Sequence, residues 1–235
     1  MLSYETLFFA FLGGIMPAMV WLYFLLKEDR RCPEPRHMIA LAVIAGMLSV
    51  ALVLPLERLA VLTLPAGIPV IIGWAAIEET VKYLLAAIIV LWRRAVDESL
   101  DLVMYMITVA LGFAALENAL FLIAPFSGGN MIEGLLTGNL RFIGSTLLHV
   151  VASAAIGFSL AFSFRMSRWV RTIFATVGLI LAIALHALFN FFIIREGGST
   201  TILAFFTVWT GAVVFFAVFE ILKYFRYRNL PKNVC

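Results

Sequence analysis

Five ionisable side chains lie inside stretches of this sequence that are otherwise apolar enough to cross a lipid bilayer. They are three glutamates and two histidines, namely Glu78, Glu79, Glu117, His149 and His186. An ionisable residue in the middle of a membrane-spanning helix costs about 2.5–3.5 kcal/mol on insertion scales, so such residues usually have a function. Imidazoles and a carboxylate are the ligands of a catalytic zinc site that keeps one position open for water. Without a metal, a glutamate and a histidine can activate a water molecule themselves.

The composition of the chain is that of a membrane protein. Of its 235 residues, 63% are hydrophobic and 13% are charged, and the mean hydropathy is +1.05. A soluble domain has about 25% charged residues, because its surface faces water. Apolar runs of about 20 residues, separated by charged clusters and by Gly and Pro, predict an all-α polytopic transmembrane bundle with about seven spans. The predicted spans are residues 4–26, 37–64, 68–92, 100–124, 140–164, 169–194 and 200–225. We interpret residues 1–235 as a single integral-membrane domain, with a short basic cytoplasmic tail at residues 226–235.

The basic residues predict the orientation of the helices. They form short clusters after the first, third, fifth and seventh predicted spans, and few lie at the opposite ends of the spans. Since short cytoplasmic loops carry the excess of lysine and arginine, we expect the N-terminus outside and the C-terminus in the cytoplasm. Clusters of this kind give no sign of a nucleic-acid partner. The longest external connection is predicted at residues 125–138, either on the membrane surface or as a mobile lid.

Helix geometry predicts that the five ionisable residues lie at one depth. With a rise of about 1.5 Å per residue, Glu78 and Glu79 lie roughly 15 Å below the outer membrane boundary. The corresponding depths are about 10 Å for Glu117, about 14 Å for His149 and about 12 Å for His186. Four helices of alternating direction should therefore bring these carboxylates and imidazoles into one layer in the outer half of the membrane.

Two further polar residues share helix faces with this set. Lys82 is three residues after Glu79 and four after Glu78, so it can neutralise a carboxylate in a medium of low dielectric constant. Asn190 follows His186 by four residues and lies one turn away on the same face. Such a cluster supports hydrolysis inside a membrane, where the available bond is a peptide bond of a substrate helix.

Four short motifs around these residues resemble the signatures of PrsW-type intramembrane proteases. They are EETVK at 78–82, GFAALEN at 112–118, HVVASAAIG at 149–157 and HALFN at 186–190. Each motif is weak by itself, but four in this order on consecutive spans are a strong signal. The loop KEDRRCPEP also resembles that family, and the likeness extends over residues 21–190. The more distant CAAX prenyl endopeptidases share the paired glutamates, but this chain differs from them at Glu117 and Tyr83.

The resemblance implies a multi-pass peptidase of the bacterial cytoplasmic membrane that cleaves membrane-anchored proteins, such as an anti-sigma factor. Position by position, Glu78 and Glu79 match the family's catalytic glutamate pair, and Lys82 matches its basic companion. Glu117, His149 and His186 match the rest of its polar centre.

From this match we expect Glu117, His149 and His186 to bind zinc. We expect Glu78 to be the base and Glu79 to be structural or a fourth ligand. The sequence alone does not distinguish these two glutamates, so the opposite assignment stays open. Asn190 is expected to orient His186 or to hold the substrate carbonyl. A mechanism that uses glutamate without metal stays open.

A membrane transporter coupled to protons or metal ions is the alternative, because acidic residues and histidines inside membranes also mark ion pathways. Transporters commonly have two related halves, and the sequence shows no internal repeat. It also carries no signal for an oligomeric state. We interpret Glu57–Arg58 as a boundary pair, and Arg141 lies near the outer boundary; neither is expected to take part in the chemistry.

Overall fold

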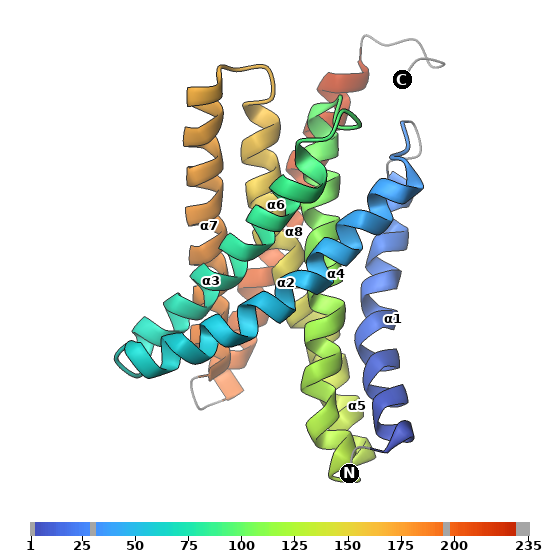
Figure 1. Cartoon of the computed structure of the whole chain (residues 1–235), viewed down its shortest axis with the longest axis vertical. Coiled ribbons are helices and arrows are strands. Elements are labelled where there is room, and N and C mark those ends of the chain that lie inside the picture. The colour runs from blue at the N-terminus through green and yellow to red at the C-terminus, as the bar shows by residue number, and fades with distance from the viewer. Residues whose placement is uncertain (1–2, 29–31, 195–197, 229–235) are drawn as a thin grey trace.

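The computed structural model describes residues 3–28, 32–194 and 198–228, and in this part of the chain every regular element is a helix (Figure 1). The helices are α1 (Tyr4–Glu28), α2 (Arg36–Thr63), α3 (Ile68–Ala86), α4 (Ser99–Ser127), α5 (Met131–Leu140), α6 (Thr146–Phe162), α7 (Arg168–Ile194) and α8 (Gly198–Tyr227). Two π-helical turns, η1 (Ala87–Leu91) and η2 (Arg141–Ser145), follow α3 and precede α6. The predicted all-α polytopic bundle is confirmed.

Six helical segments have the length and apolar composition of membrane spans, and α5, η2 and α6 together form one of them. The remaining predicted span, the third at residues 68–92, corresponds to α3 with η1, and the 19 residues of α3 include Glu78, Glu79 and Lys82. The external connection predicted at residues 125–138 is wrong. In the structure α4 continues to Ser127 and α5 begins at Met131, so most of this segment is helical.

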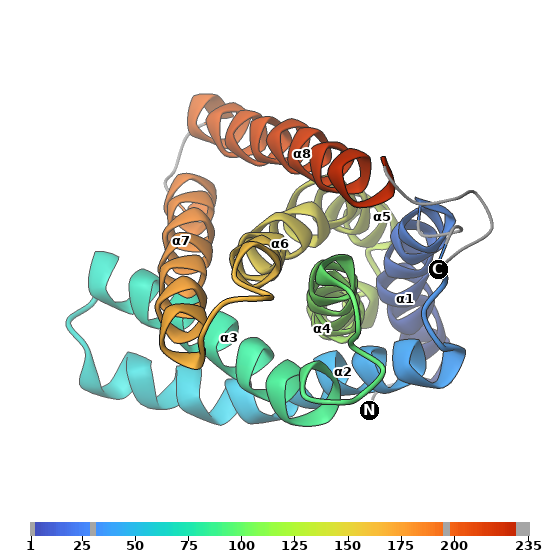
Figure 2. The ribbon, with the colours of Figure 1, turned by 90° about the horizontal axis from the view of Figure 1, so that it is seen from above.

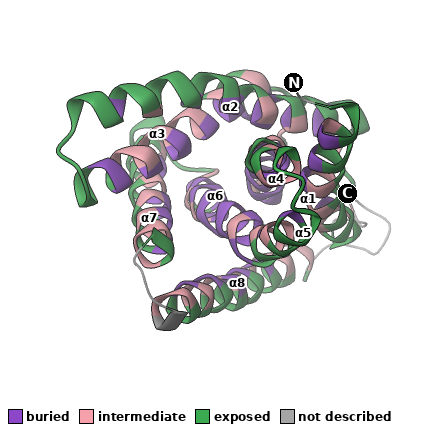
Figure 3. Ribbon diagram, turned by 90° about the horizontal axis from the view of Figure 1, so that it is seen from below, coloured by how far each residue is buried: buried purple, intermediate pink, exposed green. Residues whose placement is uncertain are grey.

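The centre of the bundle is formed by α4 and α6, which the other long helices surround (Figure 2). Helix α4 is apolar on every side, and its residues from Leu100 to Ala115 are all buried. A helix that is hydrophobic all round belongs in the interior of a bundle. The exposed faces of the outer helices carry large apolar side chains, as expected of a surface that contacts lipid (Figure 3).

Helices α2 and α3 form a tilted hairpin on one side of the bundle (Figure 1). Gly46 on α2 crosses α4 so closely that an added Cβ would lie 2.0 Å from the carbonyl oxygen of Val109. A Cβ on Gly112 of α4 would lie 2.2 Å from the carbonyl oxygen of Val43. Glycines at this crossing let the two backbones meet directly, as small residues do between membrane helices.

The loops rich in arginine all lie at one end of the bundle. The α3–α4 and α6–α7 connections are found there with the end of α8, whereas the start of α1 and the α2–α3 and α4–α5 turns lie at the other end (Figure 1). This is the arrangement that the predicted orientation requires. Of the predicted basic tail, residues 229–235 lie outside the described residues.

Candidate active site

Four of the predicted site residues converge in the bundle. Glu78 and Glu79 come from α3, His149 from α6 and His186 from α7, and one possible ligand atom of each lies within 4.8 Å of those of the others. All four side chains are buried. The convergence follows from helix contacts, because α6 and α7 lie side by side and α3 crosses both of them.

Lys82 lies in the same cluster and is fully buried. Its ammonium group donates to Glu79 Oε1 at 2.6 Å and to His149 Nδ1 at 3.0 Å, and it lies 4.0 Å from Glu78 Oε2. It also sits 4.5 Å from the ring centre of Phe113, the residue next to the glycine crossing. The lysine therefore supplies a positive charge to two buried carboxylates.

These contacts define which nitrogen of each histidine carries a proton. An ammonium can only donate, so His149 Nδ1 accepts from Lys82 and His149 Nε2 donates to Glu117 Oε2 at 3.2 Å. His186 Nδ1 donates to Glu79 Oε1 at 2.7 Å, which leaves its Nε2 as the acceptor. Each imidazole is thus held through one N–H by a carboxylate. The lone pair on its other nitrogen accepts from Lys82 in His149 and has no hydrogen bond within the described residues in His186.

Both lone pairs lie near Glu78. Its Oε1 is 3.8 Å from His186 Nε2, and its Oε2 is 3.9 Å from His149 Nδ1. Within the described residues, Glu78 Oε2 and Glu79 Oε2 are buried without a hydrogen-bond partner. A buried carboxylate oxygen without a partner is costly and is commonly satisfied by an ion or a water.

Glu117 lies at the edge of the cluster. Arg141 from η2 forms a close ion pair with it, and the side chains of both residues keep 17–18% exposure. Arg141 also donates to Asn118 Oδ1 at 2.6 Å, and Asn118 donates to Thr146 Oγ1 at 2.9 Å. The predicted ligand Glu117 therefore contacts one of the two histidines and an arginine.

Asn190 is half-buried on α7, one turn beyond His186, and its side chain makes no hydrogen bond to the cluster within the part of the chain described. Sequence reasoning missed two groups at the cluster, Arg141 and Glu57. Glu57 lies on α2 two residues after Pro55, and its side chain interacts with Glu78. The depth of Glu57 could have identified it, because a rise of about 1.5 Å per residue places it about 10 Å below the outer end of α2, in the same layer as the cluster.

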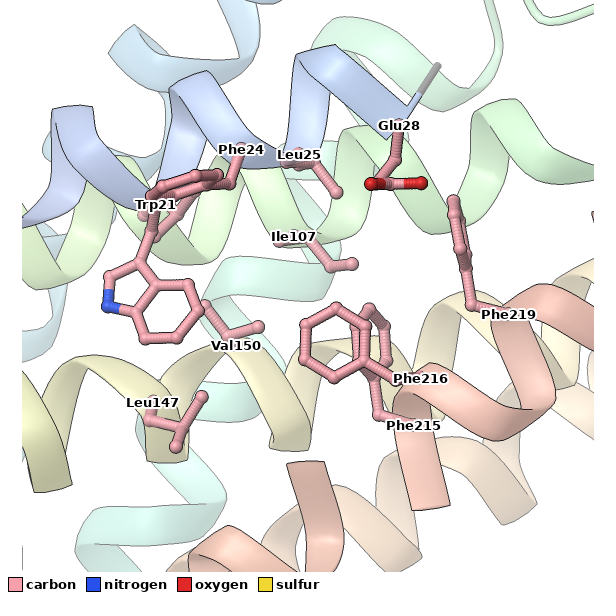
Figure 4. Close-up of a pocket in the computed structure, with 11 residues that line it drawn as sticks. Trp21, Phe24, Leu25, Glu28, Ile107, Leu147, Val150, Phe215, Phe216 and Phe219 are labelled. Carbon is pink, nitrogen blue, oxygen red and sulfur yellow. The ribbon is translucent and has the colours of Figure 1, made fainter. Parts of the chain in front are cut away.

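An apolar cavity of about 200 Å³ between α1, α4, α6 and α8 is separate from this centre (Figure 4). Leu147 and Val150 on α6 line it, although they flank His149 in the sequence. Its one charged lining residue is Glu28. The α4–α6 pair therefore divides an apolar side of the bundle from the polar cluster.

The residues present fit a divalent metal ion. Two imidazole lone pairs and carboxylate oxygens are a typical zinc donor set, and two of the buried carboxylate oxygens have no partner among the described residues. The charges agree. When ionised, Glu57, Glu78, Glu79 and Glu117 carry four negative charges against the two positive charges of Lys82 and Arg141. A divalent cation would balance the remaining two.

A bundle of membrane-spanning helices that encloses a carboxylate–imidazole centre with open metal-binding groups is the architecture of an intramembrane metalloprotease. Residues 34–222 match the family model described as PrsW family intramembrane metalloprotease, and the chain belongs to this family. All the cluster residues lie within the matched segment.

Three curated relatives are each named Protease PrsW. The protein from Clostridioides difficile (strain 630) is 27% identical over 79% of this chain and 79% of its own length. The protein from Bacillus subtilis (strain 168) is 24% identical over 76% and 80%, and that from Geobacillus kaustophilus (strain HTA426) is 29% identical over 62% and 63%. No solved structure matches the chain.

The family shows that the chain is an intramembrane protease, and its helices make it a multi-pass protein of the bacterial cell membrane. The predictions of family, enzyme class and location are thereby confirmed. The alternative of an ion-coupled transporter receives no support from the relatives.

Proposed function

We propose that the protein hydrolyses peptide bonds of membrane-anchored protein substrates, of which anti-sigma factors are one example, at a zinc ion in the cluster. The observation that supports this proposal best is the paired arrangement of the histidines. Each has one N–H held by a carboxylate and one lone pair near Glu78.

The ligands in this proposal are His149 Nδ1, His186 Nε2 and the carboxylate of Glu78, and Lys82 gives up its hydrogen bond to His149 Nδ1 when the metal binds. Ligating histidines usually donate their other N–H to a carboxylate, which orients the ring and raises its basicity. Glu117 and Glu79 have this relation to His149 and His186. A bound zinc ion supplies a water that loses its proton near neutral pH and polarises the carbonyl to be cleaved.

The remaining groups then have separate roles. Glu79 keeps one oxygen without a partner among the described residues, and we assign it as the base that accepts the proton of the attacking water. Lys82 holds the other oxygen of Glu79 in place at 2.6 Å. Asn190, one turn from His186, is assigned to hold the substrate carbonyl.

This ligand set differs from the sequence-based one, which gives Glu117 to the metal and makes Glu78 the base. Glu117 already accepts hydrogen bonds from Arg141 and from His149 Nε2. Its carboxylate therefore orients the histidine from the side opposite the lone pair. His149 and His186 are ligands in both assignments.

Glutamine variants separate these assignments, because a lost ligand removes the metal while a lost base leaves it in place. We expect Glu78→Gln to lose both bound zinc and cleavage of a purified single-pass substrate. Glu79→Gln and Glu117→Gln each remove a carboxylate that orients a histidine, so both should bind zinc about 10–100-fold more weakly. At saturating zinc, Glu79→Gln should hold the metal and still lose cleavage. Glu133→Gln, an exposed glutamate on α5, is the matched control and should change neither property.

Bound zinc is measured by elemental analysis, and cleavage is followed before and after chelation. If Glu117→Gln loses the metal and Glu78→Gln keeps it, the sequence-based assignment is correct instead. If cleavage survives both complete chelation and all three substitutions, this centre is not the site of hydrolysis.

A further inference from the structure

A second groove lies at the cytoplasmic end of the bundle, between α3 with η1 on one side and α7 on the other. Its volume is about 620 Å³, and the end of α6 forms its floor through Leu160. The two walls include Tyr83, Leu91 and Trp92 from α3 and the turns after it, and Arg168, Arg171 and Leu179 from α7. None of the cluster residues lines this groove.

The charge of the groove is concentrated at its mouth. Arg168 and Arg171 are three residues apart on the first turn of α7, so they share one helix face. Neither forms an ion pair with a carboxylate of the described residues, whereas Arg141 and Arg226 each do. Two arginines with open hydrogen-bonding groups at a membrane boundary attract an anion.

Beyond the arginines the lining is mainly apolar, with Ala87, Leu91, Leu160, Ala175 and Leu179. Thr172 and Thr176 also line it, and their hydroxyls donate to backbone carbonyls of α7. The path along α7 from Arg168 to Leu179 covers eleven residues, or about 16 Å. The π-helical turn η1 forms part of this wall, and such turns occur often at functional sites. The groove thus has a cationic mouth and a long apolar interior.

The surroundings place the groove against lipid. Trp92 at the mouth is 75% exposed, in the position of the aromatic residues that mark a membrane interface. Ile88 in η1 and Ile180 on α7 follow the lining residues Ala87 and Leu179 in the sequence and are 58% and 59% exposed. An acidic peptide segment would leave its backbone amides without partners against these apolar walls, whereas an acyl chain has no such groups.

We propose that this groove is a binding site for an anionic phospholipid, with the phosphate at Arg168 and Arg171 and one acyl chain along the apolar walls. Basic pockets between membrane helices on the cytoplasmic side are the usual place where anionic headgroups bind. The lipid would contact α3 and α7 together. These helices are also joined by the hydrogen bond between Glu79 and His186, and Tyr83 and Leu179 lie between that bond and the mouth.

The test measures binding and is independent of proteolysis. The protein is placed in nanodiscs of phosphatidylcholine and phosphatidylglycerol in equal amounts, then released for native mass spectrometry of retained lipid. We expect wild type to retain phosphatidylglycerol in preference to phosphatidylcholine. If each arginine that contacts the phosphate in the groove contributes about fivefold to binding, Arg168→Gln with Arg171→Gln should lower retention by about 25-fold.

Three further variants make the result specific. Arg93→Gln with Arg94→Gln removes two exposed charges at the same end of the bundle, outside the groove, and should retain the lipid. Arg168→Lys with Arg171→Lys keeps the charge and should also retain the lipid. Thr176→Trp fills the groove from an exposed position without changing charge, and should lose the lipid.

The proposal is overturned if the two double glutamine variants lose lipid equally, because the attraction would then be that of the whole basic surface. Equal retention of both phospholipids by wild type would also overturn it. If Arg168→Gln with Arg171→Gln keeps the lipid but raises the KM for a substrate, the groove binds an acidic substrate segment instead. Circular dichroism of each variant confirms that the fold is intact.

Discussion

Replacing Lys82 with methionine should destabilise the metal-free protein strongly. Lys82 is fully buried and its ammonium lies 2.6 Å from an oxygen of Glu79, which is also fully buried. Removing one partner of a buried ion pair leaves the other charge without compensation and costs about 3–5 kcal/mol. For a protein of this size, 1 kcal/mol corresponds to about 2–4 °C in Tm, so we expect Tm to fall by about 6–20 °C.

Lys223, a half-buried lysine whose carboxylate partners are exposed, provides a comparison for the same substitution. Lys223 lies 2.8 Å from Glu28 and 2.9 Å from Glu220, almost the distance found at Lys82, but the glutamate side chains are 47% and 62% exposed. Exposed pairs contribute about 0–1 kcal/mol, so Lys223→Met should change Tm by no more than about 4 °C. The contrast between the two variants measures the effect of burial, because chemistry and distance are matched.

Scanning fluorimetry with and without zinc completes this experiment. Without Lys82 the buried carboxylates and His149 Nδ1 lose their cation, so zinc should raise the Tm of Lys82→Met by more than it raises that of wild type. Binding at 100 times Kd contributes about 2.7 kcal/mol, which is enough to recover much of the loss. If Lys82→Met is as stable as Lys223→Met in the absence of metal, the lysine is not the compensating charge and the reasoning is refuted.

Two other substitutions test how the cluster is positioned. Gly46→Ala places a Cβ 2.0 Å from a backbone oxygen of α4 and should cost about 1–3 kcal/mol, whereas Gly138→Ala, whose nearest neighbour would be 3.7 Å away, should leave Tm unchanged. Equal Tm values for these two variants would contradict the close crossing of α2 and α4. Arg141→Gln removes the partner that holds Glu117, so cleavage should fall about 10–100-fold while zinc stays bound at saturating concentration. Wild-type kcat in Arg141→Gln would show that this ion pair does not orient the centre.

The sequence predicts the depth of polar residues well, because depth depends only on hydropathy and on the rise per residue. Glu78, Glu79, His149 and His186 were placed in one layer on that basis, and they meet in the structure. Lys82 was placed with the glutamates from its spacing, which the structure also shows.

Rotation about each helix axis and contacts between helices are not contained in hydropathy. The rotation of α4 brings Glu117 toward Arg141 and one edge of His149, and no property of the isolated segment specifies it. Arg141 lies in the π-helical turn η2, and α5 continues the helix outward over residues 131–140, most of which the sequence analysis assigns to an external connection. Glu57 lies at the depth of the cluster, but the sequence analysis interprets it as the partner of its neighbour Arg58. Its interaction with Glu78 depends on α2 and α3 tilting together, and the sequence does not show this tilt.

Hydrolysis consumes water, and the exposure of the cluster indicates where water can reach it. The side chains of Glu79 and Lys82 are completely buried, while those of Glu117 and Arg141 keep 18% and 17% exposure. These two residues come from the outer end of α4 and from η2, so the open edge of the centre faces the outer half of the membrane. The proposed lipid groove lies at the opposite end of α3 and α7, next to the cytoplasm. Water would therefore reach the cluster from the outer side past Glu117 and Arg141, while anionic lipid would bind α3 and α7 from the cytoplasmic side. The Glu79–His186 hydrogen bond, which joins α3 to α7, lies between these two regions.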